Sequence, residues 1–409
     1  MTLPTECGCA ENDGLTRRGL LGRGLAAGLA GLTGAGLSSQ LAFAAAPHTG
    51  DVLVVVSLRG GFDGLSAVVP VGDPDYYAAR PGIAVPKERI VAGDAMFGLH
   101  PALAPLVPLW QSGKLAAVHA VGQAAPNRSH FAAMEELERA AAGTSVRTGW
   151  LDRMLGGLGA TGPLGGVAVG SARPHRTLAG PSPDLSLRAI DTFTLSGESK
   201  GRMATALSAL YSGVPAGLAT PAHSAVGALA AVGALRAVTS SVTYPDTELG
   251  RALRDVARLI KGNVGLVAAA VDSGDWDMHE GLGARMPGHL GRLAAALAAF
   301  AADTAGRRVT LLTISEFGRR VAENGSGGLD HGYGNAMFVL GDGVRGGTVY
   351  GAWPGLGTGR LVNGDLAVTT DYRAVIGEIL RKRCGVSATA LSGVFPGING
   401  RDLGLVLSA

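Results

Sequence analysis

Short runs of apolar, largely β-branched residues recur along this chain, and they leave few folds open to it. Residues 51–58 read DVLVVVSL and are followed by Arg59 and a pair of glycines, while residues 309–314 read VTLLTI and are followed by a serine and a glutamate. Runs of this length and composition are typical of strands buried on both faces of a parallel sheet. The same pattern predicts further strands at residues 115–121, 165–170, 263–271 and 336–340.

Helical patterns separate these predicted strands. Residues 130–142 are rich in alanine with interspersed acids, and residues 247–260 place apolar side chains at helical spacing. Further helices are predicted at 289–302 and 371–383. Strands that alternate with helices predict an α/β fold with a mainly parallel sheet. Ligands of such sheets bind beyond the carboxyl ends of the strands, so we expect the chemically active residues there.

Composition excludes two broad classes of protein. Of the 409 residues, 47% are hydrophobic and 16% are charged, which is wrong for an intrinsically disordered chain. The 35 basic and 32 acidic residues nearly balance, so we expect no nucleic-acid partner. The length is sufficient for a large hydrophobic core.

The first 44 residues predict an export signal. A polar start leads to Arg17 and Arg18, an apolar run follows to about Leu37, and small residues surround Ala44. This order is typical of a cleaved signal peptide, and the paired arginines resemble a twin-arginine signal. The twin-arginine translocase is therefore the expected partner during export, and the expected location is periplasmic or extracellular. The alternative is an N-terminal membrane anchor.

The remaining residues, 45–409, are expected to form a single α/β domain. A Gly/Pro/Ser-rich segment at about 156–245 is expected to be an insertion or a lid. No later run combines the length and the flanks of a membrane span, so we expect no stable transmembrane segment in the mature chain.

Acids and histidines follow the predicted strands, and a further pair precedes the strand at 336–340. Carboxylates and imidazoles that converge in one cleft can bind a divalent metal such as zinc, manganese or calcium. Each residue alone has a plainer explanation, such as a turn or a surface ion pair, but four strand ends share the pattern. The candidate metal ligands are Asp63, Asp275, Asp277, His279, Glu316, Asp330 and His331.

A second group of candidates would contact an anion or attack a substrate. Ser129 precedes the helix at 130–142, where a serine can cap the helix or act as a nucleophile beside the free backbone amides. Arg59, Arg128 and Arg319 are candidate contacts to an anionic substrate.

Five motifs in order resemble one family of exported bacterial proteins, the domain of unknown function 1501. They are SLRGGFDGLSAVVP, NRSHF, DWDMH, SEFGRR and LDHGYGNAMFVLG, and the likeness runs from about residue 51 to residue 395. The resemblance places the chain in the alkaline phosphatase and sulfatase superfamily. It implies a doubly wound sheet with helices on both faces, and metals bound at the strand ends.

The same resemblance implies roles for individual residues. Asp63 matches the metal-binding acid after the first strand, and Ser129 lies near the expected nucleophile. Either Asp275 or Asp277, with His279, resembles a pair on one metal, and His331 matches the last metal histidine. The chain departs from the family pattern at Phe317, where a usual ligand is missing, and at Ala132, Ala133 and Met278.

The leading hypothesis is an exported, metal-dependent hydrolase of phosphate or sulfate esters, with a small anionic ester or a surface polymer as substrate. The rival is a non-catalytic binding or assembly protein on a degenerate alkaline phosphatase-like fold. An oxidoreductase has little support, because no strand is followed by Gly-x-Gly-x-x-Gly. No Cys-x-Pro-x-Arg motif supplies the sulfatase nucleophile.

Overall fold

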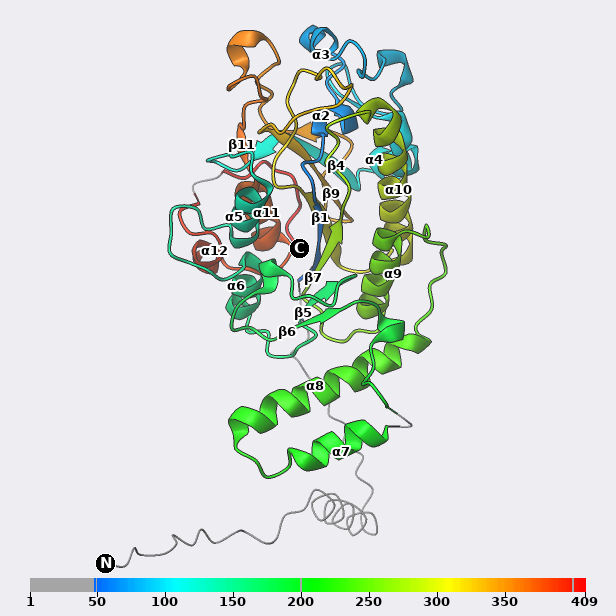
Figure 1. The fold of residues 1–409 in the computed structure, drawn as a ribbon, viewed down its shortest axis with the longest axis vertical. Helices are drawn as coiled ribbons and strands as arrows, with labels where there is room; N and C mark the ends of the chain where they lie inside the picture. Colours follow the sequence, from blue (N-terminus) through cyan, green and yellow to red (C-terminus); the bar gives the residue numbers. More distant parts are fainter. Residues whose placement is uncertain (1–47, 49, 199–200, 399–400) are drawn as a thin grey trace, which may run out of the picture. The chain divides into compact units, whose positions relative to one another are not determined.

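The computed structural model of the chain describes residues 48, 50–198, 201–398 and 401–409. The export signal predicted at residues 1–44 lies outside these residues. The described chain forms a mixed, mostly parallel sheet with helices against it, as the sequence predicts for an α/β protein (Figure 1).

The central sheet has nine strands, in the order β10-β4-β9-β8-β1-β7-β5-β6, with β11 paired to β4. A separate small pair is formed by β2 (Val68–Val69) and β3 (Gly98–Leu99). The strands of the central sheet are β1 (Val52–Leu58), β4 (Leu115–Gly122), β5 (Gly166–Val169), β6 (Asp184–Leu187), β7 (Ala268–Ser273), β8 (Val309–Ile314), β9 (Asn335–Gly341), β10 (Val349–Tyr350) and β11 (Thr370–Asp371). Every strand predicted from the sequence is present, although β7 begins later than residue 263.

Helices cover both faces of this sheet, and β1 shows why. Val54, Val56 and Leu58 point into one hydrophobic cluster, and Leu53 and Val55 point into the other. Successive side chains of a strand face opposite sides, so a run that is apolar throughout needs a covering layer on each side. Figure 1 shows α4, α9 and α10 on one side and α5, α6, α11 and α12 on the other.

The four predicted helices are present as α5, α9, α10 and α11, and the other helices of the described residues were not predicted. The largest difference between a predicted and an observed helix start is in α10, which begins seven residues before the predicted start at His289. The bounds are α2 (Gly64–Ala67), α3 (Pro74–Ala79), α4 (Val107–Gln111), α5 (His130–Arg139), α6 (Trp150–Gly157), α7 (Arg202–Leu210), α8 (Ala216–Ala234), α9 (Glu248–Lys261), α10 (Leu282–Asp303), α11 (Tyr372–Lys382) and α12 (Ala388–Val394).

One strand runs against the others. β9 pairs antiparallel with both of its neighbours, β4 and β8, whereas the pairs on either side of them are parallel. The carboxyl ends of β1, β4, β7 and β8 therefore meet the amino end of β9 at the same edge of the sheet. This edge carries the candidate site.

The Gly/Pro/Ser-rich segment predicted at 156–245 contains elements of two kinds. Its first part supplies β5 and β6, which are strands of the central sheet. Residues 194–230 belong to a separate compact unit with α7 and most of α8. Residues 216–237 form a helix long and apolar enough to cross a membrane, by length and composition alone.

Candidate metal centre

Four segments deliver side chains to one edge of the sheet. His130 is the first residue of α5, which follows β4, and Asp277 and His279 lie in the loop after β7. Glu316 follows β8 directly, and His331 precedes β9. His331 reaches the same edge because β9 is antiparallel.

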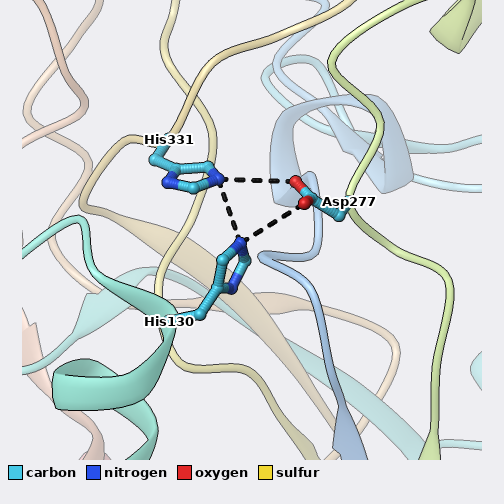
Figure 2. Close-up of side chains that lie close together, drawn as sticks. All are labelled: His130, Asp277 and His331. Carbon is cyan, nitrogen blue, oxygen red and sulfur yellow. Dashed lines mark hydrogen bonds and ion pairs between the residues drawn. The ribbon is translucent and has the colours of Figure 1, made fainter.

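Three of these residues form a possible metal-binding triad. His130, Asp277 and His331 place one ligand atom each within 4.8 Å of one another (Figure 2). The Nε2 atoms of His130 and His331 are 3.0 Å apart, and they lie 3.5 and 3.4 Å from carboxylate oxygens of Asp277. Nitrogen ligands about 2.0–2.1 Å from one tetrahedral ion are about 3.3 Å apart, so the spacing suits a shared cation.

His279 adds a fourth donor to this triad. Its Nε2 atom lies 2.9 Å from Nε2 of His331 and 2.9 Å from Oδ1 of Asp277. Its side chain is 45% exposed, and that of Asp277 is 46% exposed. The cluster of four is therefore open to solvent on the side of the β7 loop.

Each of the three imidazoles is oriented by an acceptor at Nδ1. Nδ1 donates to Glu316 Oε1 in His130 at 2.8 Å, and to the carbonyl of Arg128 in His331 at 2.8 Å. In His279 it donates to Asp330 Oδ1 at 3.2 Å. With Nδ1 carrying the proton, the neutral form of each ring directs an Nε2 lone pair into the cluster.

Glu316 is held in place by further bonds. Its Oε1 accepts the backbone N–H of Gly60 at 2.9 Å, and its Oε2 accepts the hydroxyl of Ser315 at 3.0 Å. Gly60 is required here, because a Cβ atom would lie 2.6 Å from the backbone nitrogen of Asp277. Acceptors of this kind fix the tautomer and the direction of metal-binding histidines.

Arg319 binds the loops around the cluster together. Its buried guanidinium donates to the carbonyls of Gly60, Gly61, Trp276 and Leu329, and to Asp277 Oδ1 at 2.5 Å. Its N–H groups are thereby used within the protein. The sequence-based role of Arg319 as an anion contact is not supported, because the side chain positions Asp277 and the loops instead.

The net effect of burial, neighbouring charges and hydrogen bonds lowers the pKa values of three residues in and beside the cluster, Asp277, His331 and Asp330. Burial alone would raise the pKa of Asp277, but the hydrogen bond and charge of Arg319 outweigh it and lower that pKa. Burial lowers the pKa of His331, against the hydrogen bond to the Arg128 carbonyl, and the charge of Arg319 lowers it further. The hydrogen bond from His279 is the main cause that lowers the pKa of Asp330.

The structure gives Asp63 a partner other than a metal. Arg80 donates to both oxygens of its carboxylate, at 2.7 and 3.0 Å, and Ser66 N–H donates at 3.1 Å to cap α2. Both side chains are buried. Burial would raise the pKa of Asp63, but the charge and hydrogen bonds of Arg80 lower it. The carboxylate is thus saturated, and Asp63 is not among the converging residues.

The other predicted residues lie around the cluster in different roles. Ser129 caps α5 through the N–H of Ala132, the capping role that was its alternative. Arg128 pairs with Asp365 and lies over the ring of Tyr333.

Two further predicted residues lie outside the converging group. Arg59 is neutralised by Glu138 at 2.8 Å and Asp272 at 2.6 Å. Asp275 sits in a left-handed backbone conformation at φ +66° and is exposed.

Sequence reasoning missed His130 as a candidate ligand, although it lies in the NRSHF motif. The available signal was its position at the first residue of a helix directly after a predicted strand. It also missed Arg80, whose sequence neighbourhood carries no sign that it would meet Asp63 across 17 residues.

Comparison with known proteins identifies a family. No curated protein matches the chain. The family model described as "Protein of unknown function (DUF1501)" matches residues 111–378, a span that includes all four members of the cluster but not Asp63. Because this span is more than half of the chain, the protein belongs to the DUF1501 family.

Proposed function

We propose that this protein is a metal-dependent hydrolase of phosphate or sulfate esters. The observation that carries the proposal is the convergence of three imidazole Nε2 atoms on the carboxylate of Asp277. Without a cation or an added proton, the lone pairs of His130, His279 and His331 would face one another at 2.9–3.0 Å. A divalent cation removes that repulsion.

The donor set also favours some metals over others. Three nitrogens and one carboxylate oxygen are typical of zinc sites, while calcium prefers oxygen ligands throughout. We therefore place zinc first, manganese second and calcium last among the three candidates. A divalent cation in such a site supplies a Lewis acid that polarises an ester oxygen.

The residues of this chain would divide the work as follows. His130, His279, His331 and Asp277 bind the cation, and Glu316, Asp330 and the Arg128 carbonyl keep the rings in place. Ser129 offers a hydroxyl next to His130 in sequence, at the start of α5. The free amides of that first turn favour a negatively charged group. The choice of phosphate or sulfate esters rests on the likeness to the alkaline phosphatase and sulfatase superfamily.

The test is metal analysis of the purified protein together with turnover of aryl phosphates and aryl sulfates. We expect about one equivalent of zinc per chain in the wild-type protein. His331→Ala should lose turnover. A chelator should also abolish turnover of the wild-type protein, and added zinc should restore it. His223→Ala is the matched control, because His223 is an exposed histidine of α8. Full metal content with no turnover of either ester class would contradict hydrolysis while preserving the metal site.

A specific observation supports the non-catalytic rival. The three arginines predicted to contact an anion are engaged by carboxylates or carbonyls in the folded chain. A site without a free arginine is less suited to an anionic ester than to a structural or binding role. If His331→Ala complements a deletion strain as well as the wild-type protein does, that result would favour this rival.

We also propose that the protein is exported by the twin-arginine pathway to the periplasm or beyond. The support is the order of polar, apolar and small residues around Arg17 and Arg18. The Arg17→Lys, Arg18→Lys variant should accumulate as uncleaved precursor in the cytoplasm, as detected by fractionation and mass spectrometry. Normal export of that variant would exclude this route.

A further inference from the structure

A cavity beside α9, outside the candidate metal centre, is lined by four arginines. Its volume is about 530 Å³, which is in the range of pockets that hold organic ligands. Arg251, Arg254 and Arg258 lie three and four residues apart, so they share one face of α9. The fourth is Arg236, which follows α8. All residues that line the cavity belong to one compact unit, so its shape does not depend on the unit that contains α7.

Arg254 is the member of this group that the fold leaves without a hydrogen-bond acceptor. Its side chain is 40% exposed, and its Nε atom is buried with no acceptor among the described residues. A carboxylate oxygen of Asp191 lies 3.8 Å from its Nη2 atom, which is too far for a hydrogen bond. A buried donor is costly unless water, an ion or a ligand accepts from it. Arg254 is therefore free to bind a ligand.

Three basic side chains in or behind the cavity wall are each matched by one carboxylate. The pairs are Arg251 with Asp246, Arg258 with Asp255, and Lys261 with Asp303. Tyr244, which lines the cavity, also donates to Asp303 at 3.1 Å, so this carboxylate is used within the protein. These three ion pairs add no net charge to the cavity.

The remaining charges leave the cavity with an excess of positive charge. Asp191 accepts a hydrogen bond from Arg258 at 2.9 Å. This bond is the main cause that lowers the pKa of Asp191, and the charges of Arg254 and Arg236 lower it further. Arg236 is exposed and uses one N–H group on the carbonyl of Phe193 at 2.9 Å. One carboxylate, that of Asp191, thus faces two guanidinium groups, those of Arg236 and Arg254, that no other acid balances.

We propose that this cavity binds an organic oxyanion, whose phosphate, sulfate or carboxylate group is held by Arg254 and Arg236. A planar guanidinium can donate two parallel N–H bonds to such a group. The volume leaves room for the organic part of the ligand beside Val238 and the hydroxyl-bearing Thr239 and Thr243. The site uses no residue of the metal centre, so the proposal does not depend on the proposed hydrolase activity.

Titration calorimetry with three anions tests the proposal. The probes are glucose 6-phosphate, glucose 6-sulfate and glucuronate, and glucose is the neutral control. We expect at least one of the anions to bind and glucose not to bind, and the relative affinities identify the preferred anionic group. His331→Ala, which removes a ligand of the candidate metal centre, should bind the same anion with wild-type affinity. Loss of all binding in His331→Ala would assign the anion to the metal centre and overturn the proposal.

Substitution within the cavity gives the second arm of the test. Arg254→Gln should weaken anion binding at least about tenfold, because a charged donor is removed, and Arg236→Gln should weaken it as well. Arg285→Gln is the matched control, since Arg285 is an exposed arginine of α10 that does not line the cavity.

The fold gives Arg254 no hydrogen bond to lose, so the thermal midpoint of Arg254→Gln without ligand should equal that of the wild-type protein. The anion should raise the midpoint of the wild-type protein and of Arg285→Gln, and raise that of Arg254→Gln less. Absence of binding by all three anions would overturn the proposal. Equal affinities in Arg254→Gln and the wild-type protein would overturn it too.

Discussion

A carboxylate that follows a strand can bind a metal ion or pair with an arginine, and the local sequence does not distinguish these two roles. Asp63 lies between glycine-rich turns after β1, as a metal-binding acid would, but the fold brings Arg80 to both of its oxygens. Asp277 follows β7 in a similar way, and the fold brings imidazoles to it. The difference lies in which distant side chains arrive.

Asp63→Asn tests this difference directly. The substitution leaves the buried guanidinium of Arg80 without its charged partner, so we expect unfolding free energy to fall by about 3–5 kcal/mol in urea denaturation. Metal content of the folded fraction should stay at the wild-type level. Loss of the metal with unchanged stability would instead return Asp63 to the ligand set.

Glu316→Gln tests the outer support of the cluster. The amide keeps the shape of the side chain but weakens the bond that orients the ring of His130. Loss of such a partner typically lowers metal affinity about 10–100-fold, and competition titration with a zinc chelator would measure it. Glu280→Gln is the control, because Glu280 is exposed in the neighbouring loop. Equal affinities in both variants would show that Glu316 has no orienting role.

Among the elements, the antiparallel strand β9 has the largest effect on the site. The chain after β8 and the chain before β9 continue to pair beyond the sheet, through a bridge between Arg319 and His331. The backbone N–H of Gly318 donates to the carbonyl of Tyr333 at 2.9 Å, and the N–H of Gly332 donates to the carbonyl of Gly318 at 2.8 Å. This ribbon carries His331 to the same place as the side chains from the β8 loop.

The ribbon depends on glycine at position 332. A Cβ atom there would lie 2.4 Å from the carbonyl carbon of Arg319, and the nearest atoms are all backbone atoms of Arg319 and Arg320, which cannot move aside as a side chain can. We expect Gly332→Ala to lower the free energy of unfolding by about 1–3 kcal/mol and to weaken metal binding through displaced His331. Gly325→Ala, where a Cβ atom meets nothing within 4 Å, should change neither quantity. Wild-type metal affinity in Gly332→Ala would contradict the ribbon's role.

At the scale of the whole molecule, two buried histidines make stability depend on pH. His119 on β4 packs against Phe97 and Trp353, donates Nε2–H to the carbonyl of Val68, and accepts Ala120 N–H at Nδ1. Burial is the main cause that lowers its pKa to about 4, and burial also lowers the pKa of His100 to about 4.

The consequence is a loss of stability in mild acid. Below about pH 6.5 the unfolded chain binds protons that the folded chain does not, so the free energy of unfolding falls as pH decreases from 6.5 to 4. One such histidine contributes about 3 kcal/mol of this loss at pH 4. Urea midpoints at several pH values should show it, with a shallower slope in His119→Phe and an unchanged slope in His223→Ala. If the urea midpoint of His119→Phe fell with decreasing pH as steeply as that of the wild-type protein, His119 would be excluded as a cause.

The sequence alone determined the layers of this protein. Runs that are apolar at every position can be buried only between two layers, and helical periodicity between them supplies those layers. The six predicted strands and four predicted helices therefore lie close to their predicted positions, while the short strands at the sheet edges and the other helices were not predicted. Strand ends also pointed to Asp277, His279, Glu316 and His331. These features depend on neighbours within a few residues, which a sequence displays.

Tertiary structure decided the partners and the direction of β9. If β9 ran parallel to the others, His331 would lie at the opposite edge of the sheet, yet its apolar sequence has no direction that periodicity can read. Asp63 pairs with Arg80, and His130 pairs with Glu316, which is 186 residues away in the sequence. The fold places segments that are distant in sequence side by side. Contacts of that range arise from packing of the whole core, and no local pattern records them.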